Sequence, residues 1–138
     1  MTVDELHALV SSAIWRAEQL DGLDLETSTS AWAEVSRVEE ELAKVLSIKD
    51  AEGRIARRGA VRAALKAKDY ARAQDLAQRY AGEPGAPRTL SAELRDMLKA
   101  DANVLSEQFP FAARHYKPAD VQAQANRLHQ GGPFGLAA

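Results

Sequence analysis

The chain has 138 residues, a mass of 15.0 kDa and a formal net charge of -2, and it contains no cysteine. This length fits one domain, and the lack of cysteine excludes disulfides, thiolate catalysis and cysteine-ligated metal centres. With 46% hydrophobic residues, 28% charged residues and a mean hydropathy of -0.36, the composition is that of a soluble globular protein and argues against a disordered chain.

The N-terminal residues have the features of neither a signal peptide nor a membrane span. The longest uncharged stretch near the start, Leu6 to Trp15, is interrupted by His7 and two serines and lacks a basic flank. The absence of cysteine is compatible with a reducing compartment. We therefore expect a cytoplasmic protein with no membrane association.

Two helices are predicted within the first 47 residues. Thr2 and Glu5 have the spacing of a capping box, and Gly22 supplies a stop for the helix that begins there. The polar residues 26–30 offer several N-cap residues for the second helix, whose apolar period of nearly 3.5 indicates lengthwise pairing with a neighbour. The residues predicted to face the core are Leu6, Leu9, Val10, Ala13, Ile14, Ala17 and Leu20, then Trp32, Val35, Val38, Leu42, Val45 and Leu46.

The next two predicted helices are rich in alanine. The first runs from about residue 54 to 67, and Asp69 caps the second, which ends at the turn formed by residues 82–87. Because small side chains let two helices approach closely, we expect a tight antiparallel hairpin. Its contact residues are predicted to be Ala60, Ala63, Ala64, Ala73 and Ala77, and the inward positions also include Ile55, Val61, Leu65, Tyr70, Leu76 and Tyr80.

The stretch from Ala64 to Ala73, followed by Leu76, Ala77 and Tyr80, resembles the turn and second helix of a tetratricopeptide repeat. The resemblance covers about residues 54–84, roughly one repeat, and no second copy follows at a distance of about 34 residues. Asp69 and Tyr70 match the turn of the family, whereas Lys68 stands where the family usually has glycine. The resemblance implies a helical hairpin of the kind used for protein binding.

The last part of the chain predicts two further helices. Thr89 can cap a fifth helix that ends before Pro110. Pro118 suits the first turn of a sixth helix, which ends at residues 131–133. Between them lies an aromatic link. The inward residues are Leu90, Leu94, Met97, Leu98 and Leu105, then Val121, Ala125 and Leu128, and the link contains Phe109, Phe111 and Tyr116.

The fold class predicted by these elements is all-α, because no segment alternates with the period of two that a strand requires. We expect a small bundle of about six helices with a central repeat-like hairpin, and helix boundaries near residues 22, 47, 68, 82 and 109. We expect the helices to form a single domain over residues 1–130, followed by a short C-terminal tail of residues 131–138.

No motif in the sequence indicates catalysis. Asp4 and His7 lie one helical turn apart, but a di-iron carboxylate bundle needs further acids and a second histidine at this spacing, and His115 and His129 have no partner visible in the sequence. The His-Glu-x-x-His motif, the Gly-x-Ser-x-Gly elbow and a phosphate-binding glycine loop do not occur. We therefore expect no catalytic residue, no metal, no cofactor and no enzymatic activity.

Charge is unevenly distributed along the chain. Residues 1–48 contain ten acidic residues against three basic ones, whereas residues 49–68 contain seven basic residues against two acidic ones. Four of those bases are spaced four residues apart and therefore share one helix face, which we call the basic stripe. The stripe consists of Arg54, Arg58, Arg62 and Lys66, with Arg57 beside it.

Two readings of the basic stripe remain open. In the first, the stripe packs beside the acidic residues 39–41 or is simply a solvated face. In the second, it binds phosphates or an acidic partner. Trp15, which lies off the inward stripe of its helix, and Phe134 in the tail are further candidate partner-binding residues.

The predicted function is that of a protein-interaction module, an adaptor or scaffold of a bacterial-type cytoplasmic system. It would bind another protein or a second copy of itself through helix faces, with the basic stripe setting the orientation. The alternative is a nucleic-acid-associated or phage-type accessory protein that uses the basic stripe. The net charge of -2 counts against this alternative, because nucleic-acid-binding domains usually carry excess positive charge.

Overall fold

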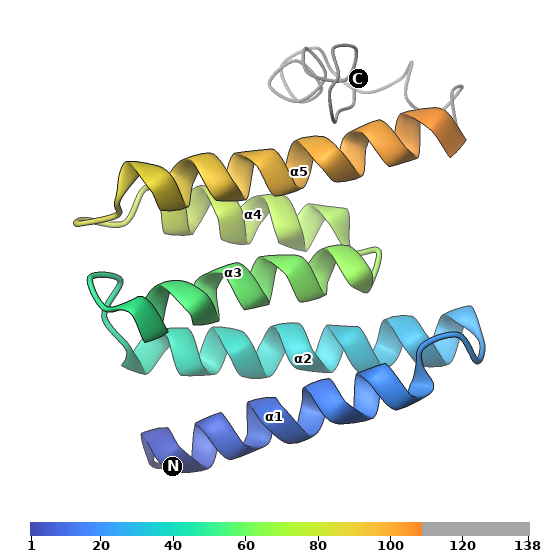
Figure 1. Ribbon diagram of the computed structural model, residues 1–138, viewed down its shortest axis with the longest axis horizontal. Helices are drawn as coiled ribbons and strands as arrows, with labels where there is room; N and C mark the ends of the chain where they lie inside the picture. The colour runs from blue at the N-terminus through green and yellow to red at the C-terminus, as the bar shows by residue number, and fades with distance from the viewer. Residues whose placement is uncertain (109–138) are drawn as a thin grey trace. The chain divides into compact units, whose positions relative to one another are not determined.

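The computed structural model describes residues 1–108, with side chains described up to residue 101. This part of the chain contains five helices and no strand, so the predicted all-α fold is confirmed (Figure 1). The expected sixth helix, the aromatic link and Phe134 lie outside the described residues. The helices are α1 (Val3–Leu20), α2 (Leu25–Val45), α3 (Ala51–Lys66), α4 (Tyr70–Ala81) and α5 (Arg88–Gln108).

The chain divides into two compact units, Met1–Leu90 and Ser91–Ala138. The boundary falls in the first turn of α5, and helices α1 to α4 all belong to the first unit. In that unit each helix packs on the helix before it and runs antiparallel to it (Figure 1). The predicted domain over residues 1–130, with a tail over residues 131–138, stays a prediction.

Side-chain caps fix where the helices of the first unit begin. The Thr2 amide donates to Glu5 Oε1 over 2.7 Å and the Glu5 amide donates to Thr2 Oγ1 over 3.1 Å, which confirms the predicted capping box. Asp69 caps α4 as predicted, by accepting from the Arg72 amide. The prediction for α2 was wrong, because the cap is Asp24 rather than one of residues 26–30. Its carboxylate accepts from the amide of Thr27, and α2 therefore begins at Leu25.

The turn between α3 and α4 is a Schellman motif. The Asp69 amide donates to the Ala64 carbonyl over 3.0 Å, and the Lys68 amide donates to the Leu65 carbonyl over 3.0 Å. Lys68 has a φ of 64°, in the left-handed region where glycine is usually found. The backbone of the turn is thus formed without the glycine that this position favours.

The core of the first unit is built mainly from small residues. The five alanines predicted to line the α3/α4 hairpin are all at most 4% exposed, and α3 packs on α4. A second cluster joins three helices, with Ala17 of α1 and Ala63 of α3 packed against Trp32 and Val35 of α2. Close helix packing, as predicted from the alanine content, therefore extends from α4 back to α1.

Three residues predicted to face the core are exposed instead. Leu9, Val45 and Ile55 have exposed fractions of 43%, 52% and 56%. Each helix buries a face of limited width, and these side chains lie beyond its edge, although Leu6, Leu42 and Val61 on the same helices are buried. Sequence periodicity overestimated the width of the buried faces.

A polar network links α2 with α4 across the core. Ser36, which is fully buried, donates to the Ala60 carbonyl over 2.8 Å and accepts from Arg72 Nε over 2.9 Å. The Arg72 guanidinium also donates to Glu40 over 2.7 Å, and Arg79 donates to the same carboxylate over 3.3 Å. Burial raises the pKa of Glu40, but the hydrogen bonds and the positive charges of the two arginines together outweigh it and hold the pKa below its ordinary value.

Candidate functional site

The N-terminal half of the basic stripe is engaged within the chain. Arg54 donates through Nη1 to the carbonyls of Ile48 and Lys49, over 3.2 and 2.7 Å, and so holds the connection between α2 and α3. Arg58 is half-buried and also has an interaction within the chain. These two arginines therefore have structural roles as well as the binding role proposed for the stripe.

Arg57, beside the stripe, is buried and anchors the segment after α4. Its Nε and Nη2 donate to the two carboxylate oxygens of Glu83, each over 2.9 Å, and Nη1 donates to the carbonyls of Leu46 and Gly53. The guanidinium carbon also lies 5.5 Å from the centroid of the Tyr80 ring. A bidentate arginine–carboxylate pair at such a site holds its two segments in a defined orientation.

Arg62 and Lys66, the C-terminal half of the stripe, are exposed on α3. The positive charge of Arg62 acts to lower the pKa of the Glu39 carboxyl on α2. The Lys66 ammonium lies 4.7 Å from the centroid of the Trp32 ring, a cation–π contact across the α2/α3 interface. These two cations are the members of the stripe that remain available to a partner.

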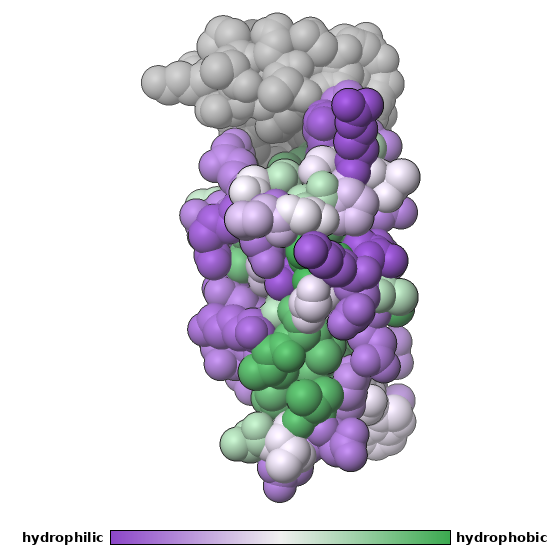
Figure 2. All heavy atoms as spheres, turned by 90° about the vertical axis from the view of Figure 1, so that its left-hand side faces the viewer, coloured by the Kyte–Doolittle hydropathy of each residue, from purple (hydrophilic) through white to green (hydrophobic). Residues whose placement is uncertain are grey.

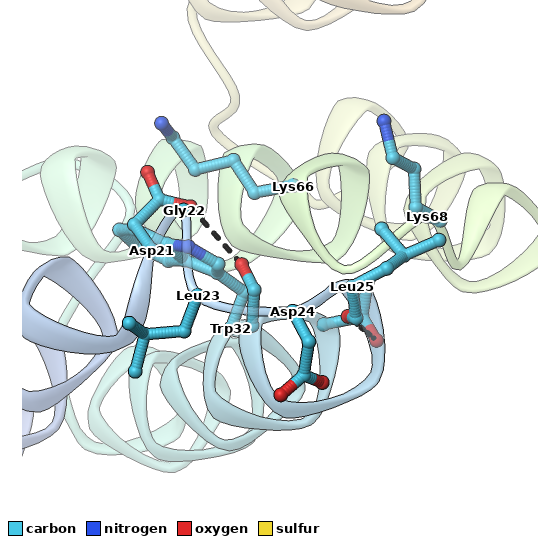
Figure 3. Close-up of a pocket in the computed structure, with 10 residues that line it drawn as sticks. Asp21, Gly22, Leu23, Asp24, Leu25, Trp32, Lys66 and Lys68 are labelled. Carbon is cyan, nitrogen blue, oxygen red and sulfur yellow. Dashed lines mark hydrogen bonds between the residues drawn. The ribbon is translucent and has the colours of Figure 1, made fainter.

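Lys66 also borders a hollow of about 400 Å³ between the α1–α2 turn and the C-terminal end of α3 (Figure 3). Lys68 follows on the same side, and the side chains of both lysines extend outward from that side (Figure 3). Among the side chains that the structure describes, those of residues 1–101, neither lysine has a carboxylate as an ion-pair partner. The volume falls in the range of about 300–1,000 Å³ that is usual for ligand sites.

The acidic residues of the hollow are used in local hydrogen bonds. Asp21 accepts from the Ser28 hydroxyl over 3.0 Å, and Asp24 accepts from the amide and the hydroxyl of Thr27, each over 2.8 Å. The backbone hydrogen bond from Thr27 is the main cause that lowers the pKa of Asp24. The Asp24 carboxylate points away from the two lysines (Figure 3).

Two leucines complete the hollow. Leu23 and Leu25 are 66% and 68% exposed, whereas Trp32, also part of the lining, is only 7% exposed. Gly22, with a φ of 89°, turns the chain tightly between α1 and these leucines. Hydrophobic side chains therefore line the same hollow as the two lysines.

Trp15 is placed apart from the stripe, on α1, and is 65% exposed. It does not line the hollow beside Lys66. The candidate residues Lys66 and Trp15 thus do not meet in one site.

A separate group of hydrophobic side chains lies where α1 begins and α2 ends (Figure 2). The exposed large hydrophobic residues of that region include Val3 and Val45.

Of the acidic residues 39–41, which could pack beside the stripe, Glu39 lies against α3 at Gly59, where the charge of Arg62 acts on its carboxyl. Glu40 instead pairs with Arg72 and Arg79 of α4, and Glu41 pairs with Lys44 over 2.9 Å. The role of α4 was missed, although Arg72 and Arg79 are seven residues apart and so lie on one helix face. Sequence reasoning also missed Lys68, Leu23 and Leu25 as site residues. For the two leucines, the available signal was a hydrophobic pair directly after the helix end at Gly22.

Within the described residues, no group of three or more histidine or acidic side chains is arranged to hold a metal ion. None of the helices in that part of the chain combines the length and apolar character needed to cross a membrane. Comparisons of the chain with protein-family models, with curated proteins and with solved structures found no match.

Proposed function

We propose that this all-α protein is an interaction module, an adaptor or scaffold, whose protein partner binds the exposed C-terminal half of α3 and the adjoining hollow. The observation that supports this most directly is the pair Lys66 and Lys68, which are exposed, form no ion pair with the side chains described up to residue 101, and share the lining of the hollow with the exposed Leu23 and Leu25. Hydrophobic contact area supplies affinity, and unpaired charges at its edge select and orient the partner.

Affinity purification from the native cell tests the proposal with a charge-reversal variant run in parallel. Arg62→Glu combined with Lys66→Glu should abolish capture of a protein partner, because like charges facing each other across an interface cost several kcal/mol. Arg37→Glu combined with Lys49→Glu is the matched control, since it makes the same change in net charge elsewhere and should leave capture intact. Equal capture by both variants would contradict the proposal.

The same experiment distinguishes the nucleic-acid alternative. If nucleic acid is recovered and is released when salt rises from ~50 to ~200 mM, phosphate binding by the exposed cations is favoured, because bound counterions are released on association. Far-ultraviolet circular dichroism and thermal unfolding of each variant confirm that a loss of capture is not a loss of folding.

A further inference from the structure

The hollow beside α3 offers two kinds of contact at once. Lys66 and Lys68 supply ammonium groups on one side, and Leu23 and Leu25 supply exposed hydrophobic surface. A ligand that satisfies both must carry negative charge and aliphatic groups within a few residues of each other. Such a ligand is an acidic protein segment that contains leucine or a similar side chain.

The acidic residues of the hollow favour a peptide over a nucleic acid. Asp21 and Asp24 belong to the same lining as the two lysines. A phosphate backbone carries charge at every nucleotide and would bring some of it close to these carboxylates, whereas a peptide can place an uncharged side chain there.

We propose that the hollow binds a short acidic segment of a partner protein, with its carboxylates paired to Lys66 and Lys68 and two aliphatic side chains placed one against Leu23 and one against Leu25. This inference rests on the proposed function and specifies the chemistry of the partner. It also assigns a role to the contact between Lys66 and Trp32. When a carboxylate draws the ammonium away from the ring, the surroundings of the indole change, and Trp32 becomes a reporter of binding.

The test uses the full chain carrying Trp15→Phe, in which Trp32 is the remaining tryptophan. The probe is the acetylated and amidated peptide Glu-Asp-Leu-Glu-Glu-Leu-Asp-Glu, titrated while Trp32 fluorescence is recorded. We expect a saturable change in emission. Lys66→Gln combined with Lys68→Gln should weaken binding at least tenfold, whereas Lys49→Gln, an exposed lysine on the connection between α2 and α3, should leave it unchanged.

Two further probes separate the contributions. The same peptide with both leucines replaced by serine should bind at least several-fold more weakly, and a single-stranded oligonucleotide of equal charge should bind more weakly than the parent peptide. Amide chemical-shift changes on adding the parent peptide to the unmutated chain should concentrate in residues 21–25 and 66–68. This measurement does not depend on the folding of any variant.

Binding that is unchanged by the double lysine substitution, or equal for the serine peptide, would overturn the inference. Tighter binding of the oligonucleotide through the same lysines would replace it with nucleic-acid recognition. If the acidic peptide does not bind but partner capture still requires Arg62 and Lys66, the inference fails while the proposed function stands. If capture is also independent of these residues, both fail.

Discussion

The Glu39 carboxylate lies against Gly59 of α3, in a space that is open only because glycine has no β-carbon. A β-carbon at position 59 would lie 2.6 Å from Glu39 Cδ. Glu39 is 7% exposed. Burial raises the pKa of its carboxyl from 4.5 to about 7, and the charge of Arg62 acts in the opposite direction. The folded chain therefore binds a proton at Glu39 more tightly than the unfolded chain does.

This difference fixes the sign of a pH effect. The contribution of Glu39 to stability is complete below pH 4.5 and is lost as pH rises to about 7. Glu39→Gln, which is neutral throughout, should match the parent near pH 4 and exceed it at pH 8 by up to about 3 kcal/mol of unfolding free energy. Urea unfolding at several pH values measures this, and Glu34→Gln, an exposed carboxylate of α2, is the control.

A variant-to-parent difference that does not vary with pH would show that Glu39 has the same pKa in the folded and unfolded chains. Because parent and variant share every other titratable group, the comparison cancels the pH effects of those groups, including groups whose effect has the opposite sign. Glu40 has a lowered pKa, so its stabilising effect is lost as pH falls rather than as pH rises.

Lys68 adopts a backbone conformation that costs an ordinary residue roughly 1–2 kcal/mol. Lys68→Gly removes this cost. Glycine also has greater conformational freedom in the unfolded chain, which lowers the unfolding free energy by about 0.4–1 kcal/mol. We expect a net gain of about 0.5–1 kcal/mol in unfolding free energy, seen as a higher melting temperature. Lys68→Ala retains the β-carbon and should give no gain; an equal gain from both would indicate that removal of the lysine charge is responsible.

At the scale of the helix, two glycines of α3 lie in close contact with neighbouring segments. Gly53 faces backbone atoms and Gly59 faces a side chain. A β-carbon at Gly53 would collide with the backbone carbonyl of Ser47 and lie 2.7 Å from its carbon, whereas one at Gly59 would meet the movable end of Glu39. Gly53→Ala should therefore destabilise the fold by about 1–3 kcal/mol despite the better helix propensity of alanine.

Gly59→Ala is the matched comparison for this helix. At position 59 the new methyl group would meet the end of a flexible side chain rather than backbone, so the alanine should cost less than at position 53. Thermal and urea unfolding of both variants would measure the order. If Gly59→Ala proved the more damaging change, the α2/α3 interface would depend on the position of Glu39 rather than on the α2–α3 connection.

The α3/α4 hairpin makes a corresponding prediction for small residues. Ala73 is fully buried on α4, and replacing it with leucine adds volume where two helix backbones approach closely. Ala73→Leu should lower the unfolding free energy by about 1–3 kcal/mol. Ala71→Leu places the same side chain on the exposed face of α4 and should change stability by less than about 0.5 kcal/mol. Similar effects at both positions would refute close packing.

Across the whole molecule, the properties that act within one helix could be predicted from sequence. The Thr2 capping box and the Asp69 cap depend on residues three apart, and the alanines of the hairpin show in composition alone. The pairing of Glu40 with Arg72 and Arg79 could not be predicted, because it depends on how α4 is rotated and shifted relative to α2. Lys68 looked like a departure from a repeat pattern, and only its dihedral angle showed the strain.

For the candidate site, sequence reasoning identified the cations but not their surroundings. Four bases spaced four apart predict one helix face, yet Arg54 is bound to loop carbonyls while Lys66 contacts an aromatic ring. The two residues differ because the first turn of α3 lies beside the α2–α3 connection, whereas its last turn lies beside Trp32 of α2. The hollow formed with Leu23 and Leu25 requires the α1–α2 turn to lie beside the end of α3, a contact between residues some forty positions apart.

The order in which α1 to α4 pack also has a kinetic consequence. Since each of these helices lies against the one before it in the chain, forming the first unit requires only short loops to close, and such topologies fold in microseconds to milliseconds. Unfolding can begin at the end of the series, because α1 has α2 beside it, whereas α3 lies between α2 and α4. Native-state amide exchange should therefore be faster in α1 than in α3, and equal protection in the two helices would indicate that the four open only together.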